Sequence, residues 1–248
     1  MASLYLVDEL DGVTAGDTVS LGGAEGRHAV SVARVRVGET LRIADGRGTV
    51  VTGAVSELGR DTLALVVETV GHEAAPRPAL VLVQALAKGG RDEMAVQAAT
   101  EIGVDRVVPW SAARSVSRWE GAKLEKGRAR WAAIAHEAAK QAVRSRVPAV
   151  DAPVTTAQLA ASASGQEARR ALVVLDPLGA VRLSAWQPPT DVDEIVLVVG
   201  PEGGIDASEF DRLTAAGAVR VRLGDTVLRT STAGPAALAV LQTRLGRW

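Results

Sequence analysis

The sequence predicts an α/β protein with a small strand-rich N-terminal domain and a larger domain built on a mainly parallel sheet. In residues 1–70, short strand-like runs are separated by glycine-containing turns, a pattern typical of a small barrel or sandwich. After residue 79, continuous apolar runs alternate with helix-like segments. That alternation indicates buried strands covered by helices on both faces. The chain of 248 residues is long enough for one large domain or two modest ones.

The N-terminal strands are expected in LRIADGRGTVVTGAV (41–55) and DTLALVVETV (61–70), where apolar residues alternate and Asp-Gly or Gly-Arg-Gly marks the turns. The stretch GHEAAPRPA (71–79) has the prolines and small residues of a linker. We therefore expect a β-barrel domain over residues 1–72, a linker over 73–79 and the larger domain over 80–248.

Five buried strands are expected in the larger domain, each a short run of mostly apolar residues. They are LVLVQALA (80–87), VDRVVPW (104–110), ALVVLD (171–176), IVLVVG (195–200) and VRVRL (219–223). No internal repeat accompanies them.

Helices are expected between these strands. Met94, Ala98 and Ile102 share one face of a helix over 91–103, and Trp131, Ile134, Ala138 and Ala142 share one over 129–143. Asp206, with Glu209 three residues later, predicts a capping-box helix start. The last helix carries Leu238, Leu241 and Leu245, which we interpret as core or dimer contacts.

Composition narrows the class of protein. Apolar residues make up 47% and charged residues 23% of the chain, and cysteine is absent, so disulfides and thiolate metal sites are excluded. No basic leader and no apolar run of membrane-spanning length is seen, so we expect a cytoplasmic protein without a membrane partner.

Charge is unevenly distributed along the chain. The net charge is only −1, yet residues 110–148 hold nine Lys or Arg against three acids, and residues 26–47 hold five Arg against two acids. Such stretches fit a polyanionic partner that meets part of the surface, and they equally fit solvated helix faces.

Several chemistries can be set aside. HEAAK (136–140) begins like a zinc-protease motif, but Lys140 stands where the second ligand would be, and His28 and His72 lie elsewhere, so no metal is expected. Gly46-Arg-Gly48 lacks the third glycine and the helix of a dinucleotide fingerprint. There is no phosphate loop and no GxSxG nucleophile.

Two glycine-containing segments remain, each directly after a predicted strand. GPEGG (200–204) follows one strand and LGDTVLRTSTAGPAAL (223–238) follows the next. Ligands of open α/β sheets bind at the carboxyl ends of strands, and glycine lets the main chain approach a ligand closely. The segments therefore predict a site built largely from main-chain groups, although GPEGG alone could be an ordinary strand-to-helix turn.

Together these motifs resemble the SPOUT class of S-adenosylmethionine-dependent RNA methyltransferases, and within it the RsmE-type family. KGGRDEMAVQAATEIGVDRVVPW (88–110), followed by Arg114, resembles that family's early α/β motif. HEAAKQAVRSRVP (136–148) is similar to its EA-x-x-Q-x-x-R-x-x-x-P helix, carried by Glu137, Ala138, Gln141, Arg144 and Pro148. His28 and Arg34 fit its PUA-like N-terminal domain. Nearly the whole chain is covered.

The resemblance implies a C-terminal trefoil-knotted domain, S-adenosylmethionine as cofactor, and methylation of N3 of one uridine in 16S ribosomal RNA. The partners implied are 16S RNA, or the assembled small subunit, and a second copy in a homodimer whose active site lies near the subunit interface. By family position, the cofactor-binding residues are Leu175, Gly200, Gly203, Leu223, Gly224, Val227, Leu228, Thr230 and Thr232. Thr232 is alternatively the cap of the last helix, and the leucines and valine are alternatively core residues.

For RNA we expect contacts from His28, Arg34, Lys88, Arg91, Arg114, Arg118, Gln141 and Arg144. Arg229 is the first catalytic candidate, because arginine stays charged and could stabilise negative charge on the uracil oxygens, or it could form a structural ion pair. Glu202 is the second, as a proton acceptor or donor ligand, or as a cap for the helix near Asp206. Ser231 stands where the family commonly has an acidic residue, so no carboxylate role transfers there.

Two other activities stay open from sequence. One is methylation of a ribose 2′-hydroxyl on the same fold, and the other is RNA binding without catalysis. No residue is identified as the general base.

Overall fold

The structure is a computed structural model that describes residues 4–163 and 169–248. It divides into two compact units. Unit 1 contains residues 1–75 together with 139–147, and unit 2 contains residues 76–138 and 148–248. No helix among the described residues has both the length and the apolar character needed to cross a membrane.

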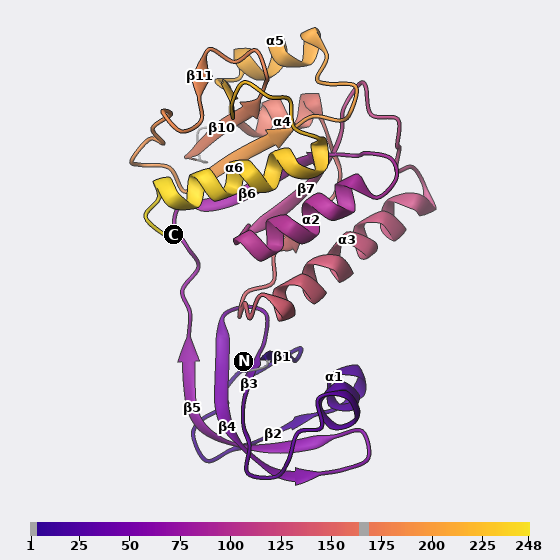
Figure 1. The fold of residues 1–248 in the computed structure, drawn as a ribbon, viewed down its shortest axis with the longest axis vertical. Helices are drawn as coiled ribbons and strands as arrows, with labels where there is room; N and C mark the ends of the chain where they lie inside the picture. The colour runs from indigo at the N-terminus through magenta and orange to yellow at the C-terminus, as the bar shows by residue number, and fades with distance from the viewer. Residues whose placement is uncertain (1–3, 164–168) are drawn as a thin grey trace. The chain divides into compact units, whose positions relative to one another are not determined.

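Unit 1 is a five-stranded sheet in the order β1-β3-β4-β5-β2 (Figure 1). Tyr5, Ile43, Val51 and Leu65 are almost fully buried in its core. Its elements are β1 (Leu4–Leu6), β2 (Thr18–Leu21), α1 (Gly23–Arg27), the π-helix η1 (His28–Val32), β3 (Thr40–Ala44), β4 (Thr49–Leu58) and β5 (Leu63–His72).

The strands expected over 41–55 and 61–70 are thus confirmed as β3, β4 and β5. Segment 139–147 joins this unit through Lys140, whose Nζ lies 2.6 Å from the Glu25 carboxylate, and through Ser145, whose hydroxyl donates to Glu73.

Unit 2 is a parallel sheet in the order β11-β13-β10-β12-β6-β7-β8, with β9 also paired to β7. Its strands are β6 (Ala79–Ala85), β7 (Arg106–Ser111), β8 (Ala149–Val150), β9 (Val154–Thr155), β10 (Arg170–Leu175), β11 (Val181–Arg182), β12 (Glu194–Val199) and β13 (Val219–Arg222). The five predicted strands are confirmed as β6, β7, β10, β12 and β13.

Helices cover both faces of this sheet. They are α2 (Arg91–Ile102), α3 (Ala122–Gln141), α4 (Thr156–Ala163), α5 (Ala207–Ala215) and α6 (Thr230–Arg244). Along β6, Leu80 and Leu82 face the core shared with α2, α3 and α6, whereas Val81 and Val83 face the core shared with α4 and α5. The apolar run is continuous because both faces are buried.

Three helix predictions have clear outcomes. The capping box is confirmed, because the Asp206 side chain accepts from the Ser208 N–H and the Glu209 side chain accepts from the Asp206 N–H. The face expected for α2 is wrong at Met94, which is 60% exposed, since the buried stripe runs through Ala95, Val96 and Ala99 where α2 packs against β6 and α6. Helix α3 begins seven residues before the expected start and ends at Gln141.

The final strand is enclosed by an earlier part of the chain. β13 pairs with β10 on one side and with β11 on the other, so it lies within the connection, residues 176–193, that joins β10 to β12. A Cβ on Gly179 would lie 2.7 Å from the main-chain carbon of Val221, so only glycine permits this close approach. The arrangement is consistent with the trefoil knot implied by the resemblance.

Candidate active site

A cavity of about 580 Å³ lies at the carboxyl ends of β10, β12 and β13. Its walls are the three loops that follow these strands and the first turn of α6, together with Arg91 at the start of α2 and Phe210 of α5. Seven of the residues expected to bind a cofactor line it: Leu175, Gly200, Leu223, Gly224, Val227, Leu228 and Thr230. The structure therefore brings together three segments, which begin at Leu175, Gly200 and Leu223 and so start more than twenty residues apart in sequence.

Gly203 and Thr232, expected at the same site, do not line the cavity. A Cβ on Gly203 would lie 3.3 Å from the Arg114 Cβ, so this glycine faces Arg114 instead. Thr232 is exposed within α6, and its predicted role as a cap is wrong. The N-cap of α6 is Arg229, and no side-chain hydrogen bond caps the helix.

Local geometry explains the glycines of the 200–204 loop. The Gly204 N–H donates to the Pro201 carbonyl at 2.9 Å, closing a tight turn, and Gly204 has φ +73°, which disfavours other residues. A Cβ on Gly200 would lie 2.6 Å from the Ile205 side chain. The loop therefore folds back on itself and presents main-chain groups to the cavity.

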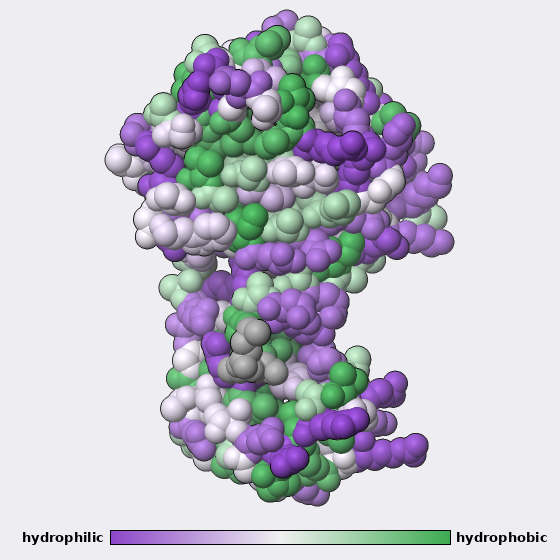
Figure 2. Space-filling model, viewed as in Figure 1, coloured by the Kyte–Doolittle hydropathy of each residue, from purple (hydrophilic) through white to green (hydrophobic). Residues whose placement is uncertain are grey.

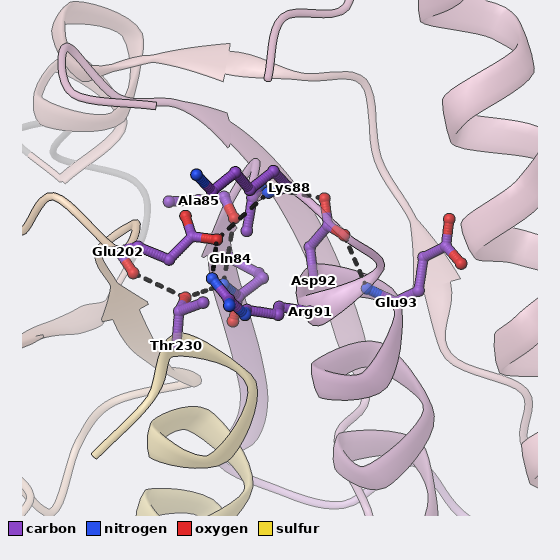
Figure 3. Close-up of polar contacts among 10 residues, drawn as sticks. Gln84, Ala85, Lys88, Arg91, Asp92, Glu93, Glu202 and Thr230 are labelled. Atoms are coloured by element: carbon purple, nitrogen blue, oxygen red, sulfur yellow. Dashed lines mark hydrogen bonds and ion pairs between the residues drawn. The ribbon is translucent and has the colours of Figure 1, made fainter. Parts of the chain in front are cut away.

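Glu202 links this loop to the loop before α2 (Figure 3). Its Oε1 accepts from Arg91 Nη1 at 2.8 Å and from the Lys88 N–H at 3.3 Å. Burial raises the pKa of the Glu202 carboxyl, but hydrogen bonds from its own backbone, from Arg91 and from Lys88 outweigh burial and hold the pKa below its ordinary value. Glu202 does not cap α5, because Asp206 performs that role.

Thr230 joins the cavity wall to the sheet. Its hydroxyl donates to the Gly200 carbonyl at 2.7 Å and accepts from Gln84 Nε2 at 2.8 Å. Gln84 is the penultimate residue of β6 and is fully buried. Figure 3 shows the Gln84 and Thr230 side chains pointing toward each other.

The loop after β10 contributes a buried acid. The Asp176 carboxylate accepts from Arg220 Nε at 2.8 Å and from the Leu178 N–H at 3.0 Å, and the Arg220 guanidinium lies 4.3 Å from the centre of the Phe210 ring. Asp176 and Phe210 both line the cavity. This cation–π contact and ion pair stiffen the wall formed by β13 and α5.

Among the described residues, Arg229 is the cation of the cavity wall whose side chain is free to contact a bound substrate. It lines the cavity, it is exposed, and its side chain makes no hydrogen bond or ion pair with any described residue. The structural ion pair considered for Arg229 is therefore not found within residues 4–163 and 169–248. Arg229 is the N-cap residue of α6, so its main chain lies at the positive end of that helix dipole.

The residues expected to contact RNA fall into two groups. Lys88, Arg91 and Arg114 surround the 200–206 loop, where Arg114 Nη2 lies 3.0 Å from the Asp206 carboxylate, and Arg118 donates to the carbonyls of Ala112 and Ala113. His28, Arg34, Gln141 and Arg144 belong to unit 1, and His28 lies in the π-helix. Four of the eight residues therefore belong to each unit.

Basic residues also mark the N-terminal half of α3, where Lys123, Lys126, Arg128 and Arg130 are exposed. Figure 2 shows hydrophilic surface where Figure 1 places this part of α3. Two of these side chains have protein partners, because Arg130 pairs with Glu93 and Arg128 donates to the Val150 carbonyl. The basic stretch 110–148 is thus partly structural.

Sequence reasoning missed four residues of the site, Gln84, Asp176, Phe210 and Arg220. Only Gln84 carried a signal, as the single polar residue of the apolar run 80–87. The others act through pairings between β10, α5 and β13 that no local pattern reveals.

Comparison with known proteins agrees with this geometry. A family model described as an RNA methyltransferase domain matches residues 74–242, and one described as an RNA methyltransferase PUA domain matches residues 21–68. The chain is 40% identical over 248 residues to ribosomal RNA small subunit methyltransferase E of Mycobacterium tuberculosis, covering all of this chain and 94% of that protein. The protein of the same name from Bacillus subtilis is 31% identical, with 93% and 92% covered.

Solved structures give the same relationship. The crystal structure of a ribosomal RNA small subunit methyltransferase E from Neisseria gonorrhoeae, bound to S-adenosylmethionine, superposes with a TM-score of 0.85 at 27% identity and 98% coverage of both chains. A putative methyltransferase from Legionella pneumophila, also in complex with S-adenosylmethionine, superposes with a TM-score of 0.83 at 26% identity and the same coverage.

Proposed function

This chain belongs to the ribosomal RNA small subunit methyltransferase E family of S-adenosylmethionine-dependent enzymes, and we propose that its methyl acceptor is N3 of one uridine in 16S ribosomal RNA. The observation that carries the proposal is the cavity formed by the loops after β10, β12 and β13, with Arg229 at its wall, whose side chain has no partner in the part of the chain that the structure describes. The same loops follow the strands whose sequence motifs resemble the uridine-N3 enzymes.

The cavity residues fit S-adenosylmethionine. A volume of about 580 Å³ lies within the range of small-molecule sites. Apolar side chains such as Leu175 and Leu223 offer surfaces for the adenine ring, and main-chain groups of 200–204 and 223–229 offer partners for its polar edges. A Cβ on Gly224 would meet nothing within 4 Å, so that glycine opens into free space.

S-adenosylmethionine supplies a methyl group already activated on a sulfonium. The protein must therefore act on the acceptor, because uracil N3 carries a proton at neutral pH. As that proton leaves, negative charge spreads onto O2 and O4. We propose that the Arg229 guanidinium and the N-terminal end of α6 stabilise this charge, because Arg229 lines the cavity as the N-cap of α6, and that holding N3 in line with the methyl group supplies the remaining effect.

Glu202 is better suited to positioning than to proton transfer. A carboxylate whose pKa is lowered is a weak proton acceptor at neutral pH. Its bonds to Arg91 and to the Lys88 N–H hold the 200–204 loop against the start of α2. We assign it that role and leave the proton to another acceptor.

We assign RNA contacts to the two groups of basic and polar residues described above. Phosphate contacts would supply salt-dependent affinity, and an unstacked uridine would be read inside the cavity. We also propose that the protein acts in the cytoplasm, on a ribosomal RNA substrate that is either naked or in the assembled subunit.

We also propose a homodimer. Leu178 and Val227 lie at the cavity wall, yet they are 85% and 78% exposed. Exposed apolar side chains at a functional cavity are suited to cover by a second copy. Light scattering on wild type and on Leu178→Asp tests this, and a monomeric wild-type protein would contradict it.

The function is tested by mapping modified nucleotides in 16S RNA from cells lacking the protein. We expect one uridine to lose its N3 methyl group and purified enzyme with S-adenosylmethionine to restore it. Transfer to RNA whose target uridine has a blocked N3 would instead indicate a ribose 2′-O-methyltransferase. Absence of S-adenosylmethionine binding by calorimetry would indicate an RNA-binding protein without catalysis.

A further inference from the structure

Gln84 is a buried amide in a strand that otherwise buries apolar side chains. It has no exposed surface, and its Oε1 has no hydrogen-bond partner among the described residues. Burying an amide without full hydrogen bonding is costly, and an apolar residue would fill the same space at lower cost. A buried group of this kind therefore calls for a role beyond packing.

The bonds that Gln84 does make lead to the cavity wall. Nε2 donates to the Ala85 carbonyl at 3.1 Å and to the Thr230 hydroxyl at 2.8 Å, and that hydroxyl donates to the Gly200 carbonyl at 2.7 Å. This relay joins the ends of β6 and β12 to the first residue of α6 (Figure 3).

The donor and acceptor properties of the amide and hydroxyl groups determine which atom donates in each hydrogen bond. The reversed amide would place Oε1 against the Ala85 carbonyl, which would bring two acceptors together, so the amide nitrogen must face both partners. Because Nε2 donates to the Thr230 oxygen, the single hydroxyl proton of Thr230 is committed to the Gly200 carbonyl. The relay thus fixes both the Thr230 rotamer and the Gly200 carbonyl.

We propose that Gln84 is a positioning residue for the methyl-donor pocket, acting through Thr230 to hold the 200–204 loop and the start of α6 in the donor-binding arrangement. The inference rests on the proposed function of this cavity. Gln84 does not itself line the cavity, whereas Gly200 and Thr230 do. Its amide therefore affects donor binding without touching the donor.

The test compares wild type with Gln84→Met, which keeps an unbranched side chain of similar size and removes both amide donors. We expect KM for S-adenosylmethionine to rise about tenfold, as loss of a buried hydrogen-bond donor implies, with KM for RNA unchanged. Gln97→Met makes the same chemical change on the exposed face of α2 and should leave both constants unchanged.

Two substitutions at Thr230 examine the relay from its other end. Thr230→Val removes the hydroxyl at nearly constant shape and should raise the donor KM by a similar factor, whereas Thr230→Ser keeps the hydroxyl and should stay within about twofold of wild type. In the double variant Gln84→Met with Thr230→Val, the two effects should not multiply, because each breaks the same relay.

A merely structural role gives a different result. Loss of folded protein lowers the apparent kcat and leaves the donor KM unchanged, and that outcome in both Gln84→Met and Thr230→Val would overturn the proposal. If Gln84→Met does not fold, the Thr230 pair decides alone. A wild-type protein that does not bind S-adenosylmethionine would refute the proposed function itself, a result distinct from equal donor KM values in wild type and variants.

Discussion

The Arg91 guanidinium lies 2.8 Å from the Glu202 carboxylate and thereby ties the first residue of α2 to the loop after β12. The side chains are 32% and 23% exposed, so solvent screens the pair only partly. Pairs of this kind contribute up to about 1 kcal/mol. The contact therefore helps to set one wall of the cavity and adds little to global stability.

Glu202→Gln should reduce stability at neutral pH and have a smaller effect in acid. The folded-state pKa of Glu202 lies below the unfolded value, so the ionised carboxylate stabilises the native state above the unfolded pKa, and this contribution is lost as pH falls through the folded pKa. We expect a deficit of up to about 1 kcal/mol at pH 7 that closes as the pH falls below the ordinary glutamate pKa of 4.5 and through the lowered folded-state pKa.

Urea denaturation at several pH values measures this deficit. Glu101→Gln, which removes an exposed carboxylate from α2, serves as the control for the change of charge. A Glu202→Gln deficit that stays constant or grows as pH falls would contradict the prediction.

Arg229→Gln should impair catalysis far more than donor binding. Removing a charged donor that stabilises developing negative charge typically costs about 100-fold in kcat. The dissociation constant for S-adenosylmethionine should change less than about threefold, because the charge is needed only in the transition state. Arg229→Lys should retain part of the activity, since it keeps the charge without the planar fork.

Single-turnover methyl transfer and calorimetry measure the two quantities for Arg229. The prediction fails if Arg229→Gln keeps its single-turnover rate, or if the loss lies entirely in donor affinity.

Gly224→Val should block the cavity without disturbing the fold. A Cβ there meets nothing within 4 Å, and the residue lines the cavity, so added methyl groups would occupy space needed by the donor. We expect donor affinity to fall at least about tenfold and the melting temperature to change by less than about 2 °C.

Gly71→Val in β5 is the control, because Gly71 is also outside the left-handed region and a Cβ there would come no closer than 4.0 Å to its nearest neighbour, so donor affinity should stay unchanged. If Gly224→Val keeps both the wild-type Tm and the wild-type affinity for S-adenosylmethionine, the assignment of Gly224 to the binding site is refuted.

Val143→Gly should stabilise the protein. Val143 has φ +56°, and the N–H groups of Val143 and Arg144 donate to the carbonyls of Lys140 and Ala139, which is the Schellman pattern that normally places glycine at this position. A β-branched residue there is strained, so glycine should gain about 1 kcal/mol. Ala142→Gly, one residue earlier, should destabilise, and a lower calorimetric Tm for Val143→Gly would refute the argument.

Much of the fold could be predicted from the sequence, because the strands and helix starts depend on local residue patterns. Continuous apolar runs such as 195–200 predict strands buried on both faces, and Asp206 with Glu209 predicts a helix start, and both are confirmed. The α/β class and the PUA-like N-terminal domain are likewise confirmed. The buried face of α2 could not be predicted from the sequence. Met94 and Val96 are both apolar, and only packing against α6 decides which of them is buried.

The candidate site, like the fold, could be predicted from the sequence only in part. Glycine-rich loops after strands predicted where a cavity would form, because that rule follows from parallel-sheet geometry. The long-range partners of Glu202, Thr230 and Asp176 could not be predicted, since each lies on another element and is 30 to 146 residues away. Such pairings depend on how the strands are ordered, which hydrophobic periodicity does not specify.

Gly127→Ala illustrates a local rule that the tertiary fold reverses. Alanine normally stabilises the middle of a helix by about 1 kcal/mol relative to glycine. In α3, however, a Cβ on Gly127 would lie 2.4 Å from the Trp119 ring, whose centre is 5.1 Å from that of Trp131 in an edge-to-face pair. We expect Gly127→Ala to lose about 1–3 kcal/mol in urea denaturation, as overpacking does. In a Trp119→Leu background the same substitution should cost less or become stabilising, and an unchanged cost there would show that Trp119 is not the obstacle.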